Sequence, residues 1–190
     1  MRICAVVLAA GLSSRMGEEK LLMCYDGLPL GEYIFKNLKQ NSALFSQVQV
    51  VGRLPQTHEL AKLYGFGYTQ NLQPSRGMGH SLALGVQAAE ECDGFMVALS
   101  DMPRLKVGTV YTLCNAFAKE PTRIAVPLYG GRRGNPVIFP ASFRQELSLL
   151  DGDSGGRNII KRHSESLLRV QTYDDGILRD IDTIEDIKTV

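Results

Sequence analysis

The stretch ICAVVLAAGLSSRMGEEK, residues 3–20, decides the fold. Its opening residues 3–8 form a short apolar run whose length and β-branched content are typical of a buried strand. The run gives way to a small polar loop that contains Gly11, Gly17, Arg15 and Lys20. Glycine lets the backbone approach an anion, and the two cations offset phosphate charge. The stretch therefore predicts a phosphate-binding loop after the first strand, with an ordinary turn as the alternative.

This loop departs from two widespread phosphate-binding motifs. A Walker loop requires G-x-x-x-x-G-K-[ST], but Gly11 and Gly17 are one residue too far apart, and Glu18 follows them. A dinucleotide fingerprint requires G-x-G-x-x-G, and the closely spaced first pair of glycines is missing. The missing pair counts against an NAD(P)-dependent oxidoreductase, which stays an alternative from another class.

Composition places the chain among soluble globular proteins. Its 190 residues suit one domain spanning 1–190, with 44% hydrophobic and 22% charged residues. A net charge of +1 gives no overall attraction to nucleic acid or to an anionic membrane, so neither is expected as a partner. No run approaches the roughly 20 apolar residues of a membrane span. The four cysteines form no C-x-x-C motif, and three of them lie in apolar surroundings, which predicts buried, reduced thiols in a cytoplasmic protein.

Apolar runs alternate with segments of helical periodicity along the whole chain. Strands are expected at 3–8, 48–51, 67–69, 94–99, 122–127, 137–139 and 167–170. Helices are expected at 30–40, 56–64, 78–92, 107–118, 143–150 and 158–162. The first half shows no tight hairpin, which favours parallel pairing with helices on both faces. We therefore predict a three-layer α/β/α, Rossmann-like domain with a mostly parallel sheet and at least one antiparallel strand in the second half.

A second glycine-bearing loop, NLQPSRGMGHS at 71–81, leads into the helix expected from residue 78. The start of a helix presents free N–H groups that bind anions. Arg76, Gly77, Gly79 and Ser81 are therefore predicted to form a second nucleotide contact. The alternative is a plain helix cap, made by Ser75 or Ser81.

Asp101 follows the strand expected at 94–99, and Pro103 ends the turn. Ligands of open α/β sheets bind beyond the carboxyl ends of the strands. A carboxylate there is suited to Mg²⁺, which prefers oxygen ligands and often also binds substrate phosphates. The alternative is a turn aspartate that caps the helix expected at 107–118.

Two later glycine-rich loops carry further cations. Residues 128–136, LYGGRRGNP, offer Arg132 and Arg133 to an anionic substrate, unless they form a solvated hairpin tip. Residues 151–157, DGDSGGR, end in Arg157.

The acidic segment 179–186, RDIDTIED, comes near the end of the chain. Thr183 and Asp186 have the spacing of a helix cap, with Asp in place of the usual Glu. Asp180 and Asp182 are left unexplained by that cap, and either is a candidate metal ligand. The alternative is ordinary negative charge at the start of a final helix.

The residues of the first loop resemble the signature L-A-A-G-x-S-x-R-M-G-x-x-K of the MobA-like nucleotidyltransferases. Five later segments resemble further blocks of this family in family order: 76–81 (RGMGHS), 99–103 (LSDMP), 133–136 (RGNP), 152–157 (GDSGGR) and 180–186 (DIDTIED). Within that superfamily the chain looks most like the molybdenum cofactor cytidylyltransferases. His80 and Ile184 depart from the Ser and Pro usual at their places.

The resemblance implies transfer of a nucleoside monophosphate from an NTP to the phosphate of molybdopterin, with release of pyrophosphate. Ala10 gives L-A-A-G rather than L-A-G-G, which favours CTP over GTP. Mg²⁺ is the implied cofactor, and a molybdoenzyme or its chaperone is a possible partner. Rival acceptors are a sugar phosphate or another cofactor precursor, and a non-catalytic cofactor-delivery module is a further alternative.

The same resemblance implies a set of site residues. The nucleotide is expected on Leu8, Ala9, Ala10, Gly11, Ser13, Arg15, Gly17 and Lys20, together with the contacts at 76–81. Arg15, Lys20 and Asp101 are the expected catalytic residues, and Asp101 and Asp182 the expected metal ligands. Arg132, Arg133, Asn135 and Arg157 are expected to bind the acceptor.

Overall fold

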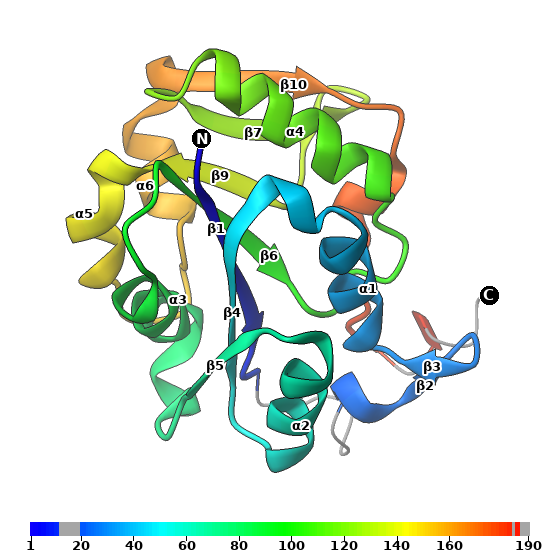
Figure 1. Ribbon diagram of the computed structural model, residues 1–190. Helices are drawn as coiled ribbons and strands as arrows, with labels where there is room; N and C mark the ends of the chain where they lie inside the picture. The colour runs from blue at the N-terminus through cyan, green and yellow to red at the C-terminus, as the bar shows by residue number, and fades with distance from the viewer. Residues whose placement is uncertain (12–19, 184, 187–190) are drawn as a thin grey trace.

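A mixed β-sheet forms the middle layer of the molecule in the computed structural model, which describes residues 1–11, 20–183 and 185–186 (Figure 1). The strands follow the order β10-β7-β9-β6-β1-β4-β5, and β8 pairs with β7. Their bounds are β1 Ile3–Ala9, β4 Phe45–Gly52, β5 Gly67–Gln70, β6 Gly94–Leu99, β7 Ile124–Tyr129, β8 Arg132–Arg133, β9 Val137–Pro140 and β10 Leu167–Gln171. The predicted strands are all present, with ends shifted by a few residues.

The strand directions agree with the predicted mixed sheet. β1 runs parallel to β4 and β6, β4 runs parallel to β5, and β7 runs parallel to β10. The antiparallel pairs, β6 with β9 and β7 with β8 and β9, all involve strands of the second half. The carboxyl ends of β1, β4 and β6 therefore share one edge of the sheet, at the lower side of Figure 1.

Six α-helices cover the two faces of this sheet within the described residues (Figure 1). They are α1 Glu32–Gln40, α2 Pro55–Tyr64, α3 Gly77–Ala88, α4 Val107–Lys119, α5 Arg144–Ser148 and α6 Arg157–Arg162. Alternate residues of β1 point to opposite faces, as the pleat requires. Ala5 and Val7 join the core under α1, α2 and α4. Val6 and Leu8 join the core under α3, α5 and α6.

Two local features differ from the expectations. A tight hairpin, β2 Cys24–Tyr25 and β3 Leu28–Pro29, lies in the first half of the chain, where none was expected. The helix expected at 78–92 ends at Ala88. The guanidinium of Arg144 binds the last carbonyls there, donating to Val86 at 3.1 Å and to Ala89 at 3.0 Å. A distant side chain thus satisfies the groups that an α-helix leaves unpaired at its end.

The cysteine prediction is confirmed for three positions. Cys4, Cys92 and Cys114 are buried, Cys24 is exposed, and all four are free thiols. Burial raises the pKa of Cys4 and of Cys114 to about 12. Thiols of this kind are unreactive, so they belong to the core rather than to a catalytic site.

Among the residues that the structure describes, no helix combines the length and the apolar character needed to span a bilayer.

Candidate active site

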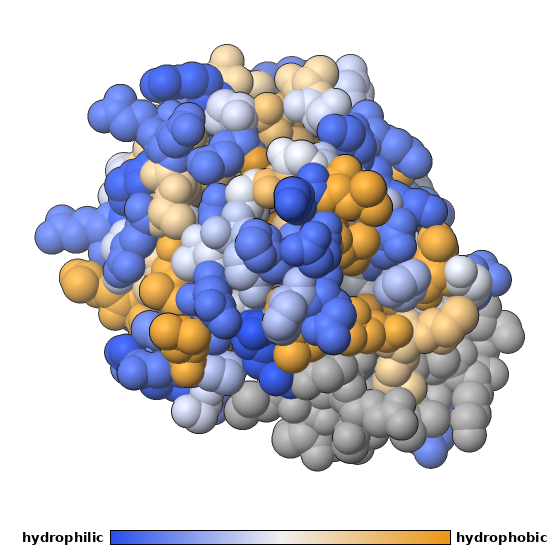
Figure 2. Space-filling view, turned by 60° about the horizontal axis from the view of Figure 1, so that its bottom comes forward, coloured by the Kyte–Doolittle hydropathy of each residue, from blue (hydrophilic) through white to orange (hydrophobic). Residues whose placement is uncertain are grey.

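A cleft of about 840 Å³ lies at the carboxyl edge of the sheet. Figure 2 brings the lower side of the molecule forward and shows small groups of hydrophilic and hydrophobic residues beside each other. The cleft is lined by Leu8, Ala10, Gly11, Lys20, Leu21, Pro74, Ser75, Gly77, Met78, Ser81, Leu99, Ser100, Asp101, Met102, Arg132, Arg133, Gly134, Asn135, Asp153, Arg157, Ile177, Leu178, Asp180 and Asp182. Most of the predicted site residues that the structure describes therefore meet in one place.

Ser100 joins the ends of the two central strands at the floor of the cleft. Its buried hydroxyl donates to the carbonyl of Leu8 at 2.7 Å, and its amide donates to the same oxygen at 3.2 Å. The next residue, Asp101, accepts a bond at its own carbonyl from the amide of Ile181, at 3.0 Å. Asp101 is thereby tied on one side to the sheet and on the other to the C-terminal acidic segment.

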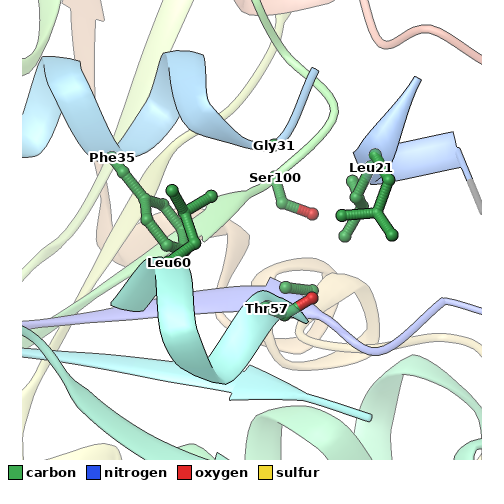
Figure 3. Close-up of a pocket in the computed structure, with 8 residues that line it drawn as sticks. Leu21, Gly31, Phe35, Thr57, Leu60 and Ser100 are labelled. Carbon is green, nitrogen blue, oxygen red and sulfur yellow. The ribbon is translucent and has the colours of Figure 1, made fainter. Parts of the chain in front are cut away.

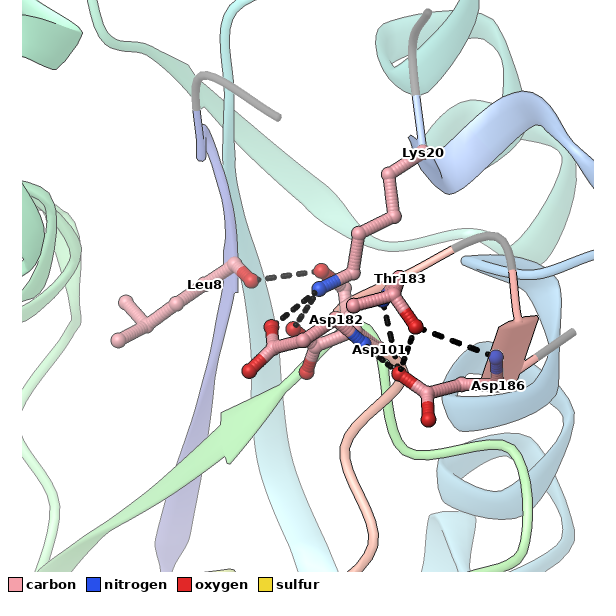
Figure 4. Close-up of polar contacts among 7 residues, drawn as sticks. Leu8, Lys20, Asp101, Asp182, Thr183 and Asp186 are labelled. Atoms are coloured by element: carbon pink, nitrogen blue, oxygen red, sulfur yellow. Dashed lines mark hydrogen bonds and ion pairs between the residues drawn. The ribbon is translucent and has the colours of Figure 1, made fainter. Parts of the chain in front are cut away.

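Lys20 bridges two carboxylates from distant parts of the chain (Figure 4). Its Nζ lies 2.9 Å from Oδ2 of Asp101 and 3.0 Å from Oδ1 of Asp182. The Lys20 side chain is 12% exposed, against 21% for Asp101 and 54% for Asp182. The predicted catalytic lysine and both predicted metal ligands thus form one charged cluster.

The charged groups of this cluster change one another's pKa values. Burial lowers the pKa of Lys20, but Asp101 and Asp182 outweigh that effect and raise it above 10.5. Burial raises the pKa of Asp101 above 3.8, although Lys20 acts in the opposite direction. A raised carboxyl pKa means that ionised Asp101 is poorly compensated by its surroundings.

One oxygen of Asp101 also lacks a partner. Oδ1 is buried and accepts no hydrogen bond among the described residues. A buried acceptor without a partner costs free energy, and a cation beside it removes that cost. Two carboxylates at one edge, supplemented by substrate phosphates, are a usual way for proteins to bind Mg²⁺. The residues therefore fit a divalent cation, although no cluster of three or more His, Cys, Asp or Glu suited to a metal occurs among the described residues.

The predicted cap near the chain end is confirmed and explains how Asp182 is placed. The Oδ2 atom of Asp186 accepts from the amides of Asp182 at 3.0 Å and Thr183 at 2.8 Å. The amide of Asp186 donates in return to the Thr183 hydroxyl at 3.3 Å (Figure 4). Asp180 also lines the cleft and is near enough to Asp101 to help raise its pKa.

Ser81 faces the cleft from α3 and has a defined orientation. Its hydroxyl accepts a bond from the side-chain amide of the buried Asn71 at 2.9 Å. The alternative prediction, a helix cap made by Ser75 or Ser81, is not seen. The N-cap residue of α3 is Arg76, and its side chain makes no capping hydrogen bond.

Arg76 and Gly79 are not among the residues that line the cleft. Arg76 forms two hydrogen bonds with Asp151, from Nε at 3.2 Å and from Nη2 at 3.0 Å. The amide of Gly79 donates to the carbonyl of Gly152 at 2.7 Å. Both residues thus hold the loop at 151–156 rather than face the open space.

Three arginines that line the cleft differ from other arginines of the chain in their charged neighbours. Arg132 and Arg133 form β8, opposite the end of β7, so the hairpin expected as an alternative is present and still borders the cleft. Arg157 begins α6. Among the described residues, no carboxylate pairs with these three side chains, whereas Arg123, Arg162 and Arg179 each pair with one.

Four predicted site residues remain. Ser13, Arg15 and Gly17 fall outside the described residues. Ala9 lines a second, mostly apolar cavity between β1, α1 and α2, which also includes Phe35 and Thr57 (Figure 3). That cavity measures about 10 Å³, enough for no more than one water molecule.

Sequence reasoning missed the apolar part of the cleft. Leu99, Met102, Ile177 and Leu178 line it, and none has a pattern that distinguishes it from a core residue. A cleft lined by apolar side chains as well as charged ones suits a heterocyclic ring with polar substituents.

The family model described as MobA-like NTP transferase domain matches residues 5–167. The chain belongs to this family. The MobA-like assignment made from sequence is thus confirmed, and it places the chain in the nucleotidyltransferase superfamily.

Two curated relatives span nearly the same length. "Purine catabolism protein PucB" of Bacillus subtilis (strain 168) is 31% identical over 97% of this chain and 94% of its own. "Nicotine blue oxidoreductase" of Paenarthrobacter nicotinovorans is 28% identical over 96% of this chain and 93% of its own.

Solved structures support the MobA-like fold. Rv0371c of Mycobacterium tuberculosis H37Rv superposes with a TM-score of 0.81 at 24% identity, covering 99% of this chain and 96% of its own. A second structure of Rv0371c, with a TM-score of 0.76 at 22% identity and all of both chains covered, is a complex with manganese.

Proposed function

We propose that this protein transfers a nucleoside monophosphate, CMP from CTP, to the phosphate of molybdopterin, releasing pyrophosphate. The observation that carries the proposal is that one cleft holds the cluster of Lys20, Asp101 and Asp182 together with three arginines that pair with no carboxylate of the described residues. A cleft of about 840 Å³ is near the upper end of the usual range for small-molecule sites, which suits two substrates.

Two groups of residues that line the cleft have different chemistry, and we propose that the two substrates divide between them. The acidic cluster with Lys20 is suited to a triphosphate and its cation. Arg132, Arg133 and Arg157 are suited to the phosphate of the acceptor, with Asn135 as a neutral hydrogen-bonding neighbour. The apolar residues that line the cleft are suited to the ring of the acceptor.

The reaction needs no protein base. A phosphate is already anionic at neutral pH, so an acceptor oxygen attacks the α-phosphorus directly. The new P–O bond forms in line with the bond to the leaving pyrophosphate, which takes the electron pair. Lys20 offsets negative charge on the phosphates, and the three arginines hold the attacking group in position. Arg15, which lies outside the described residues, is proposed as a further cation.

Asp101 and Asp182 are the proposed ligands of a divalent cation. Mg²⁺ bound there would neutralise charge on the triphosphate and orient it. The manganese complex of Rv0371c supports a divalent cation in a protein of this fold. The buried Oδ1 atom of Asp101 is the ligand atom that the described residues leave without a hydrogen bond.

The nucleotide base is proposed to lie beside Leu8, Ala10 and Gly11, which line the same cleft as Ser81. Ala10 is the basis for CTP, because its methyl group narrows the space available to a larger purine. A GTP-dependent enzyme with the same metal site is the alternative within the class.

An oxidoreductase is a second candidate, favoured by the name of the relative that is 28% identical. The charged cluster argues for phosphoryl chemistry instead, because hydride transfer does not require two carboxylates bridged by lysine. We therefore include a nicotinamide cofactor in the test.

The deciding experiment is calorimetric titration of the protein with CTP, GTP and NADPH, each with and without Mg²⁺. We expect Mg²⁺-dependent binding of CTP that is tighter than binding of GTP. Asp101→Asn should weaken the Mg²⁺-dependent part, and Asp175→Asn, an acid paired with Arg179 outside the cleft, serves as the matched control.

Each other outcome contradicts a definite part of the proposal. A preference for GTP would overturn the choice of base and leave the metal site standing. Binding of NADPH without binding of either NTP would overturn nucleotidyl transfer and favour the oxidoreductase.

A further inference from the structure

The loop at 151–156 and the start of α3 are joined by hydrogen bonds in which each segment both donates and accepts. The amide of Gly152 donates to the carbonyl of Arg76 at 2.9 Å, and the amide of Gly79 donates to the carbonyl of Gly152 at 2.7 Å. The Arg76 guanidinium adds two hydrogen bonds to Asp151. Residues about 75 positions apart in sequence are thus joined by backbone and side-chain contacts together.

Two glycines make this close contact possible. A Cβ atom at Gly79 would lie 2.7 Å from the carbonyl oxygen of Asp151 and 2.9 Å from that of Gly152. Gly77 has a φ of +89°, and a Cβ atom there would collide with Gly152 and Asp153. Since the atoms in the way at Gly79 belong to backbone, an alanine there displaces the loop rather than a flexible side chain.

The fastened loop leads directly into the cleft. Asp153 lines it from the loop, and Arg157 lines it from the first position of α6. The amide of Arg157 donates to the carbonyl of Ser154 at 3.0 Å, so the start of α6 depends on the loop conformation. The start of α3, which packs against the loop, supplies Gly77, Met78 and Ser81 to the lining of the same cleft.

We propose that Arg76, Gly79 and Asp151 are positioning residues: they clasp the 151–156 loop to α3 and so place Arg157 for the anionic acceptor. The acceptor role rests on the proposed function. In this arrangement Arg76 contributes to acceptor binding through the loop, and it is not a nucleotide ligand.

Gly79→Ala is the first test, with Gly108→Ala as its matched control. Both glycines lie in helices, but a Cβ atom at Gly108 meets nothing within 4 Å. Hydrogen exchange followed by mass spectrometry should show faster exchange in residues 149–157, on the order of tenfold, for Gly79→Ala alone. With molybdopterin as acceptor, Gly79→Ala should raise the acceptor KM about tenfold and change the Kd of Mg²⁺–CTP less than about threefold.

Charge reversal supplies a second test that adds no side chain at the tight contact between Gly79 and the loop. Arg76→Asp and Asp151→Arg should each speed exchange in the loop and raise the acceptor KM. The double variant should restore slow exchange in the loop and a low acceptor KM, because an ion pair between positions 76 and 151 forms again with the two charges exchanged.

The outcomes separate this proposal from the proposed function. Equal loop exchange in Gly79→Ala and Gly108→Ala would overturn the clasp. A loss of Mg²⁺–CTP affinity in Arg76→Asp that the double variant does not restore would make Arg76 a nucleotide contact and overturn the proposal. Failure of the unaltered protein to bind Mg²⁺–CTP would instead overturn the proposed function, while exchange in the charge-reversal series would still decide whether the clasp exists.

Discussion

Asp101 combines three properties at the residue scale: it follows a buried strand, it pairs with Lys20, and one of its oxygens has no partner among the described residues. An aspartate that only capped the next helix would not need this environment. The first turn of α4 is instead served by Asp174, which accepts from the Lys106 amide and the Thr109 hydroxyl. The capping alternative for Asp101 is therefore unnecessary.

Asp101→Asn should lower the rate of nucleotidyl transfer on the order of 10²-fold or more, comparable to the loss of one preorganised electrostatic group. The amide keeps the size of the side chain but removes the charge that would hold Mg²⁺. Pyrophosphate release at saturating Mg²⁺ measures the effect. Turnover close to that of the unaltered protein would remove Asp101 from the proposed mechanism.

The same variant tests the pH dependence of stability. Because burial raises the pKa of Asp101 above 3.8, the folded state holds its proton more tightly than the unfolded chain does. Ionising Asp101 therefore costs stability as the pH rises from the unfolded value through the higher folded value. The free energy of unfolding of Asp101→Asn, relative to the unaltered protein, should increase across that window. Urea unfolding at closely spaced pH values measures it, and a decrease would show that Lys20 dominates over burial.

At the scale of elements, the loop between β10 and η6 (Asp175–Leu178) fastens α4 through one buried carboxylate. Asp174 is 2% exposed. It accepts from the Lys106 amide at 2.9 Å, the Thr109 hydroxyl at 2.6 Å and the Gly176 amide at 3.0 Å. The chain beyond β10 can then run along the cleft and deliver Ile177 and Leu178 to it.

Asp174→Ala should lower the free energy of unfolding by roughly 3 kcal/mol, since it removes a helix cap and leaves buried donors unpaired. Asp175→Ala is the exposed neighbour and should change it by less than about 1 kcal/mol, the usual range for a surface ion pair. Chemical denaturation of both variants measures the difference. Equal effects would mean that the contacts of Asp174 add little to stability.

At the scale of the whole molecule, the cleft forms at the edge of a sheet that packs, within the described residues, against three α-helices on each face (Figure 1). Residues from positions 8 to 182 meet there, so ligand binding should be linked to stability of the complete fold. A ligand that binds the folded state alone stabilises it by mass action.

Mg²⁺–CTP at about 100 times its Kd should raise the free energy of unfolding by about 2.7 kcal/mol, or roughly 5–10 °C in Tm. Thermal unfolding followed by circular dichroism measures this shift. CTP without Mg²⁺, and Mg²⁺–CTP added to Asp101→Asn, should each give a clearly smaller shift. An equal shift in all three would place the nucleotide away from Asp101.

Patterns of neighbouring residues were enough to predict the layers and much of the cleft. Short continuous apolar runs, apolar segments with helical period, and glycine or proline between them depend on local sterics and on burial of apolar side chains. They are therefore readable from neighbouring residues, as with β1 or with Asp101 after β6. Asp101 was expected beyond the carboxyl end of its strand by the same reasoning, whereas its ion pair with Lys20 is seen only in the structure.

Only the tertiary structure decided which distant groups pair. Arg76 has the same local surroundings in sequence whether it contacts a nucleotide or Asp151, and it is the packing of the 151–156 loop on α3 that settles its partner. Asp180 and Asp182 are likewise equivalent in sequence, yet Lys20 bridges Asp182 to Asp101. Such pairs depend on where whole elements lie in space, and no local pattern of residues encodes that position.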